Sequence, residues 1–230
     1  MRDQSSIFGI VYTETWRMYK QHFWLFFVVA LLISWVGAFI PKAFILAHPV
    51  AAFFISIISG LVQLIGAASI IATAKLFSEG AQAIGIGQAL RLGMIPLFTL
   101  IGATILCLLI GLVGMVFLII PGLVFAFFAC LYLPIVVCEK VTAWGSIKRS
   151  CGLVKHHWVV VFCVTFFGSV LMGFVAFVPG LLFAYLQLTN PQGMLRIVAE
   201  IMSFITSAIT LSFYSLLSFH LLRVLTLLED

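Results

Sequence analysis

Long apolar runs separated by short polar stretches dominate this chain. A helix needs about 20 apolar residues to cross the hydrocarbon core of a bilayer. Six runs qualify, and they predict membrane-spanning helices over residues 23–46, 50–77, 95–120, 122–138, 158–185 and 197–227. The predicted fold class is therefore all-α: a polytopic membrane helix bundle of six transmembrane helices plus short amphipathic interfacial helices, in one integral membrane domain over residues 1–230.

Only Pro121 and Gly122 separate the third apolar run from the fourth. Proline cannot donate to a helix ladder and glycine tolerates positive φ, so this pair predicts a tight turn. The alternative is one long, kinked helix. We reject it because the combined run exceeds 40 residues, about twice the length that a bilayer accepts.

Short motifs recur along the chain. The sequence IPGLVFA at 120–126 matches VPGLLFA at 178–184, and IPKAF at 40–44 is a fainter copy. These matches predict three pseudo-repeats, 1–79, 80–140 and 141–230, each an interfacial helix followed by a membrane hairpin. The alternative is that the hairpins of any membrane protein use proline and glycine at their turns.

Two polar stretches, residues 6–22 and 142–157, have helical periodicity. The apolar face of the first carries Phe8, Val11, Tyr12, Thr15 and Tyr19. The cationic faces of the two stretches carry Arg17, Lys20, Lys148, Arg149 and Lys155. Such a helix lies at the headgroup level with its cations toward anionic phosphates. We predict that these five residues contact anionic lipid headgroups. The alternatives are a simple anchoring elbow and a docking face for a membrane protein partner.

Composition and charge support a membrane protein and exclude nucleic-acid binding. Charged residues are 8% of the chain, against roughly 25% in a soluble domain. The net charge is +5, but the cations lie in short stretches between apolar runs, as expected for contact with lipid headgroups. All but two of the 12 Lys and Arg residues, Lys42 and Arg196, fall on one side of the six-span map. This bias predicts that both termini are cytoplasmic. Polar residues within the first twenty positions also argue against a cleavable signal peptide.

Polar residues inside the apolar runs are the usual pointers to function in membrane proteins. Gln63 is the one amide deep in a run, and the last run carries a stripe of Ser203, Ser207, Thr210 and Tyr214. These residues predict an intramembrane polar seam between the second and sixth spans, which could line a path or a headgroup cavity. The alternative is close helix packing through small and hydroxylic side chains. A buried Gln63 would need a hydrogen-bonding partner.

Catalytic motifs are absent from the sequence. It contains no HExxH, no GxSxG and no phosphate-binding glycine loop. The five cysteines lack CxxC spacing and are expected to be apolar fillers. His156 and His157 are adjacent, so they point about 100° apart on a helix and do not suit one metal ion. His220 is expected to snorkel or to cap the end of the last span. We expect no enzymatic activity, no cofactor and no metal site.

Three stretches carry a resemblance to a known family: ETWRMYKQHFW at 14–24, IPGL at 120–123, and the segment 139–155 with EK, SIKRS and LVK. The chain resembles the bacterial YciC-type inner-membrane proteins. That family is similar to the membrane domain found beside some glycerophosphoryl diester phosphodiesterases. The resemblance implies an all-helical module in the bacterial inner membrane, with no settled activity and no catalytic residue to carry over. The phosphodiesterase domain itself has no counterpart in this sequence.

These observations predict a non-enzymatic membrane module that serves lipid or envelope organisation, or an accessory subunit. The alternative function is a small transporter or channel for an apolar or amphiphilic solute, with the predicted seam as its path. With 230 residues, a transporter of this kind would call for a homo-oligomer.

Overall fold

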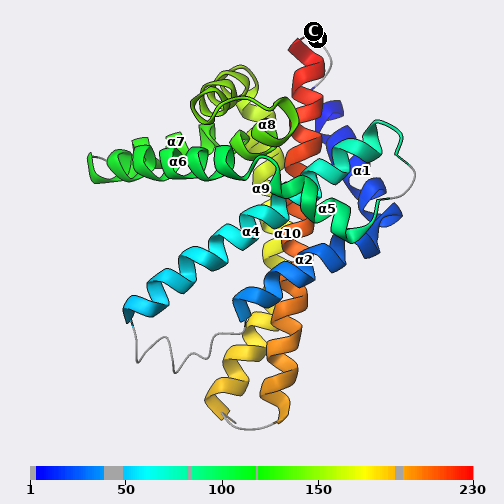
Figure 1. Cartoon of the computed structure of the whole chain (residues 1–230), viewed down its shortest axis with the longest axis vertical. Coiled ribbons are helices and arrows are strands. Elements are labelled where there is room, and N and C mark those ends of the chain that lie inside the picture. The colour runs from blue at the N-terminus through cyan, green and yellow to red at the C-terminus, as the bar shows by residue number, and fades with distance from the viewer. Residues whose placement is uncertain (1–3, 39–48, 82–83, 118, 190–193, 230) are drawn as a thin grey trace.

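The computed structural model describes residues 4–38, 49–81, 84–117, 119–189 and 194–229, and every regular element in those ranges is a helix (Figure 1). The helices are α1 (Gln4–Gln21), α2 (Phe23–Ala38), α4 (Pro49–Ser78), α5 (Ile86–Met94), α6 (Leu97–Phe117), α7 (Ile119–Phe128), α8 (Tyr132–Glu139), α9 (Ala143–Thr189) and α10 (Met194–Glu229). The predicted all-α fold class is confirmed.

Among the described residues, five segments are long and apolar enough to cross a membrane, and Phe23–Ser34 of α2 is a shorter apolar helix. By its composition and helix lengths, the chain is therefore a multi-pass membrane protein. Five long segments and one short one approximate the six predicted spans. The rest of the predicted first span, residues 39–46, and the faint motif copy at 40–44 fall mostly or wholly outside the described residues.

Two features differ from the predictions, and one predicted boundary is matched. The predicted span 122–138 is divided between α7 and α8, because the chain turns between Phe128 and Tyr132 through hydrogen bonds of the tight i→i+3 type. The predicted interfacial helix 142–157 and span 158–185 are continuous in α9, but a kink at His157 (φ −125°, ψ 30°) separates them at the predicted boundary. Pro179 lies inside α9 and does not mark a hairpin turn.

The α6–α7 pair is a hairpin, and the alternative of one long helix is wrong. A Cβ built on Gly114 would lie 3.0 Å from the Cα of Gly122, whereas residues eight apart in a continuous helix are about 12 Å apart. Pro121 and Gly122 lie within the first turn of α7 and not between the helices, since α7 begins at Ile119. Proline suits this position because the first N–H groups of a helix have no intrahelical partner.

The helices spread from a common end of the molecule (Figure 1). The helices α9 and α10 run side by side along the long axis, α4 crosses them obliquely, and the α6–α7 hairpin projects sideways. The amphipathic helix α1 packs on α9 and α10, and α5 packs on α4. Each of α1, α5 and the first part of α9 precedes apolar helices, which is the order that the repeat hypothesis predicts. The repeats themselves stay a prediction.

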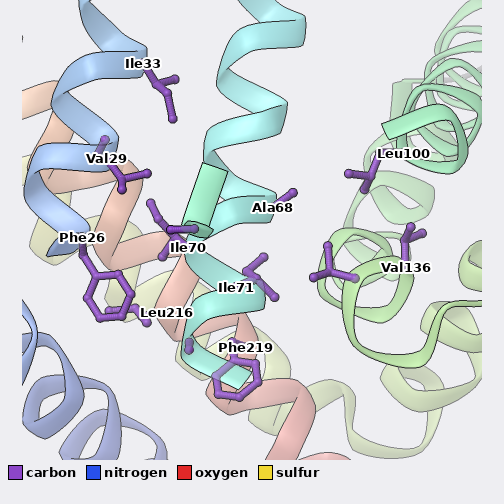
Figure 2. Packing of buried hydrophobic residues seen from close by; sticks show 14 of the residues in the cluster. Phe26, Val29, Ile33, Ala68, Ile70, Ile71, Leu100, Val136, Leu216 and Phe219 are labelled. Atoms are coloured by element: carbon purple, nitrogen blue, oxygen red, sulfur yellow. The ribbon is translucent and has the colours of Figure 1, made fainter. Parts of the chain in front are cut away.

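The core centres on α4. Figure 2 shows Ile70 of α4 on the side of Phe26 and Val29 of α2, and Ile71 on the other side of α4, toward Val136 and Leu100. Both isoleucines are 0–1% exposed. The residues of α4 that face this cluster include small side chains such as Ala68 and Ala74. Small residues allow close helix approach, which drives helix association inside a bilayer where lipid is as apolar as the core.

The predicted apolar face of α1 is confirmed, but other helices of the protein cover it. Val11, Thr15 and Tyr19 are buried, while Arg17 and Lys20 are exposed. Val11 belongs to a buried cluster with residues of α9 and α10, and the Tyr12 hydroxyl donates to the Val164 carbonyl of α9 at 2.9 Å. The apolar side of α1 thus packs on helices and not on lipid.

Candidate functional site

A charged cleft lies where α1, α4, α8 and α10 meet. Two cavities of about 460 and 190 Å³ form it, and Ser78 and Arg223 line both of them. The ionisable side chains of the lining are Glu14, Arg17, His22, Lys75, Glu79, Cys138, Glu139, His220 and Arg223. Glu14, Arg17 and Gln21 of α1 line the cleft, beside the face of α1 that is buried against α9 and α10.

The cations of the cleft differ in how they are paired. Arg17 lies 3.4 Å from Glu14 of the same helix. Lys75 lies 4.0 Å from Glu79, and its Nζ donates to the Cys138 carbonyl at 2.8 Å, which ties α4 to the last turn of α8. Within the described part of the chain, Arg223 has no carboxylate within 4.0 Å. Arg223 is therefore the cation of this cleft that is free to pair with an anion.

Two histidines complete the wall of the larger cavity. His22 stacks on Phe77 with ring centroids 3.7 Å apart and planes 7° apart. Burial lowers the pKa of the His22 imidazole below its usual value, so this side chain is neutral at pH 7.

His220 is 2% exposed, and its Nε2 has no hydrogen-bonding partner among the described residues. A buried polar atom without a partner costs about 1–3 kcal/mol. The expectation that His220 snorkels to the surface is wrong, because neighbouring helices cover it.

The structure separates the five predicted headgroup residues into four environments. Arg17 lines the charged cleft. Arg149 joins three helices, since it lies 3.7 Å from Glu139 and 2.6 Å from Glu229. Lys20 lies over the Trp16 ring, 5.0 Å from its centroid. Lys148 and Lys155 are exposed on α9, and within the described residues neither has an ion-pair partner.

The predicted polar seam is only partly assembled. The helices α4 and α10 are in contact, but Gln63 is exposed on α4, and no hydrogen bond in the described residues joins it to α10. Ser203 and Ser207 are also exposed, and the half-buried Thr210 donates to the Thr206 carbonyl of its own helix at 2.8 Å. Tyr214 is half-buried. Among the described residues the protein does not bury Gln63, and the seam and a path along it stay predictions.

No protein-family model matches the chain, and no curated protein or solved structure matches it significantly. The resemblance to the YciC-type proteins stays a prediction. Sequence reasoning placed Lys75 and Arg223 on the same side of the membrane as Arg17, but it missed that they share one cleft. The sequence does show that both residues lie near the ends of predicted spans. It does not show which of these spans lie next to each other in the membrane.

Proposed function

We propose that this protein is a non-enzymatic module of the bacterial inner membrane that binds the headgroup of an anionic phospholipid in the charged cleft. The termini and the cleft face the cytoplasm in this proposal, as the distribution of Lys and Arg predicts. The observation that carries it is Arg223, a cation without a carboxylate partner among the described residues, beside the buried and unpartnered Nε2 of His220.

The chemistry of a phosphodiester suits these groups. Arg223 offers a planar fork of N–H donors that matches two phosphate oxygens. In the tautomer that carries its proton on Nε2, His220 supplies a further donor, and a phosphate oxygen would remove the cost of leaving that atom unpaired. Arg17 lines the same cavity, and its exposed pair with Glu14 is weak enough to be exchanged for a phosphate.

Replacing Arg223 tests this function. Arg223→Gln keeps a polar, hydrogen-bonding side chain but removes the charge. A surface cation contributes about 1 kcal/mol to binding an anionic leaflet, so we expect a roughly fivefold lower ratio of retained phosphatidylglycerol to phosphatidylethanolamine, measured by native mass spectrometry.

Arg91→Gln is the matched control, because Arg91 is an exposed cation on α5 that does not line the cleft. This control should retain the wild-type lipid ratio. An Arg223→Gln protein that retained phosphatidylglycerol as the wild type does would remove the proposed function.

Acidification should strengthen headgroup binding through His22. Its pKa is lowered in the lipid-free protein, and a bound phosphate favours the imidazolium, so affinity for phosphatidylglycerol should rise as the pH falls below about 6.5. The stability of the lipid-free protein should change in the opposite sense. Protonating the desolvated His22 ring costs free energy. The folded protein is therefore most stabilised above about pH 6.5, and it loses this stability as the pH falls toward the lowered pKa of His22.

Binding of phosphatidylglycerol nanodiscs over this pH range measures the effect of His22. His22→Gln should make the affinity less dependent on pH. Identical pH profiles for the variant and the wild type would contradict a role for His22.

A further inference from the structure

The α6–α7 hairpin is packed on the protein at its base and exposed along the rest of its length. Leu100 and Ala103 of α6, near the base, are 0% exposed. Further along α6 the exposed fraction is 66% at Leu108 and 63% at Leu112. A Cβ added at Gly111 would meet nothing within 4 Å. About 10 residues of α6, or about 15 Å of helix, therefore extend beyond the packed base.

The base of the hairpin lies near one end of the long α9–α10 pair. A Cβ on Gly102 of α6 would lie 3.4 Å from the Cβ of Ala143, where α9 begins. Ser150 of α9 hydrogen-bonds to the α7–α8 junction at 2.8 and 3.2 Å. Arg149, its neighbour, lies 2.6 Å from Glu229, where α10 ends. The base is therefore held at the end of the molecule where α9 begins and α10 ends.

From this base the hairpin runs crosswise to α9 and α10 (Figure 1). Its contact with the second part of α9 is again near the base, where Phe127 of α7 meets Phe162 just past the kink, with ring centroids 6.1 Å apart. The helices α9 and α10 contain the two longest candidate spans in the described ranges. Their common axis therefore marks the membrane normal, apart from a usual tilt of about 20°. A helix that runs crosswise to them lies close to the membrane plane.

The exposed faces of α6 require hydrocarbon around them. Ile105, Leu109 and Val113 follow one face by steps of four and are 51–57% exposed, and Leu108 and Leu112 are exposed on the adjacent face. An interfacial helix would turn a charged or polar face toward the headgroups, but residues 97–117 contain no charged side chain. A helix that docks on a partner protein needs only one apolar face. The hairpin therefore lies among acyl chains, below the headgroups.

One leaflet is thick enough to hold the hairpin. A helix with its side chains is about 10–12 Å across, and half of the hydrocarbon core is about 15 Å thick. Figure 1 shows α6 and α7 at nearly the same height along the long axis of the molecule. The hairpin can therefore lie flat in one leaflet without reaching the other.

We propose that the α6–α7 hairpin lies in the membrane plane within the hydrocarbon of one leaflet, and that the protein thereby favours membrane that bulges toward that leaflet. A hairpin held in one leaflet adds area to that leaflet alone, and bending the membrane relieves the imbalance. The leaflet is the cytoplasmic one in the orientation proposed above. The in-plane position itself does not depend on the charged cleft.

The depth of spin labels along α6 tests the in-plane position. Leu108→Cys, Leu112→Cys and Met115→Cys are made one at a time in the full-length chain without its native cysteines, and each is checked for wild-type elution in size-exclusion chromatography. The labelled proteins are reconstituted into vesicles of phosphatidylcholine and phosphatidylglycerol. Depth is measured from the collision rates of the label with oxygen and with a water-soluble nickel chelate. The three positions share one helical face, so the three labels should lie at equal depth in the hydrocarbon.

Three positions on α9 provide the matched control. Val170→Cys, Phe174→Cys and Phe177→Cys have the same spacing of four and three residues, and the native side chains are 40%, 71% and 59% exposed. Because α9 follows the long axis, the first and last of these labels should differ in depth by about 10 Å at 1.5 Å per residue.

Sorting between flat and curved membrane tests the curvature preference. The protein is reconstituted into giant vesicles of the same two lipids, and a dye that does not cross membranes is attached from outside to a tag at the C-terminus. Only molecules whose hairpin end faces outward are then followed, because α10 ends near the base of the hairpin. These molecules should be denser in a tube pulled outward from the vesicle than in its flat membrane.

Three results would overturn the proposal. A depth gradient of about 10 Å along α6, as in the α9 control, would show that the hairpin crosses the membrane. Low oxygen access at all three α6 labels would show that a second copy or another protein covers the hairpin. Equal density in the tube and the flat membrane would remove the curvature preference. Arg223→Gln should change none of these measurements, so the failure of this proposal and the failure of the charged cleft are distinguishable.

Discussion

Gly93→Ala is expected to destabilise the protein by about 3 kcal/mol or more, since overpacking of this kind leaves no room for relaxation. Gly93 of α5 is buried against α4. A Cβ added there would collide with the Ser69 hydroxyl and would lie 2.7 Å from both the Ile65 carbonyl oxygen and the Ser69 nitrogen. Backbone atoms of α4 cannot rotate away as a flexible side chain can, so α5 would have to leave its position.

The midpoint of thermal unfolding in detergent, followed by size-exclusion chromatography, measures this effect. Gly87→Ala is the matched control in the same helix, because a Cβ at Gly87 meets nothing within 4 Å. Alanine is the better helix former by about 1 kcal/mol, so this variant should match or exceed the wild type. Equal midpoints for the two alanine variants would show that α5 does not pack on α4 in this way.

Ser150→Ala is expected to cost about 2–5 kcal/mol, because it leaves two backbone groups at the α7–α8 junction without their partner. The Ser150 hydroxyl donates to the Phe128 carbonyl and accepts from the Leu131 N–H, and the serine is fully buried. Removing it also removes the polar link between α9 and the base of the α6–α7 hairpin. The unfolding midpoint should fall clearly, and limited proteolysis should open the chain near residues 128–132 first.

Ser146→Ala separates this effect from the loss of any buried serine. Ser146 lies one turn earlier on α9 and is equally buried, but its hydroxyl donates only to the Ala143 carbonyl of its own helix. That carbonyl keeps its place in the helical ladder, so the cost should stay below about 1 kcal/mol. A Ser146→Ala variant as unstable as Ser150→Ala would contradict the role of Ser150 as a link between helices.

The sequence predicted features that depend on local pattern alone. The apolar lengths predicted the long helices α4, α6 and α10 to within a few residues at most ends. The periodicity of residues 6–22 predicted both faces of α1, and burial of Val11 with exposure of Arg17 agrees. The predicted boundary between residues 157 and 158 coincides with the kink of α9 at His157. One failure is local: the break after Phe128 falls inside an apolar stretch where no Gly or Pro marks it.

Candidate sites were harder to predict because they depend on lateral contacts. The sequence pattern predicts that Arg149 contacts lipid headgroups, but the fold places it beside Glu139 and Glu229. The sequence also groups Gln63 with the hydroxyl stripe of α10, but whether the side chain of Gln63 meets that stripe depends on how α4 packs, and in the fold it is exposed. An apolar hollow of about 760 Å³ along the α6–α7 hairpin is marked by no motif, since it arises where residues of α6 and α7 face one another.

The sequence by itself determined that this chain forms membrane-length helices with cationic amphipathic segments, because length, apolarity and helical spacing are properties of neighbouring residues. Only the tertiary structure decided which cations keep a free charge and which apolar faces meet protein. Within the described ranges Arg223 has no ion-pair partner, whereas Arg149 is paired. An ion pair needs atoms within 4 Å, and the partners of Arg149 lie 10 and 80 positions away in the chain.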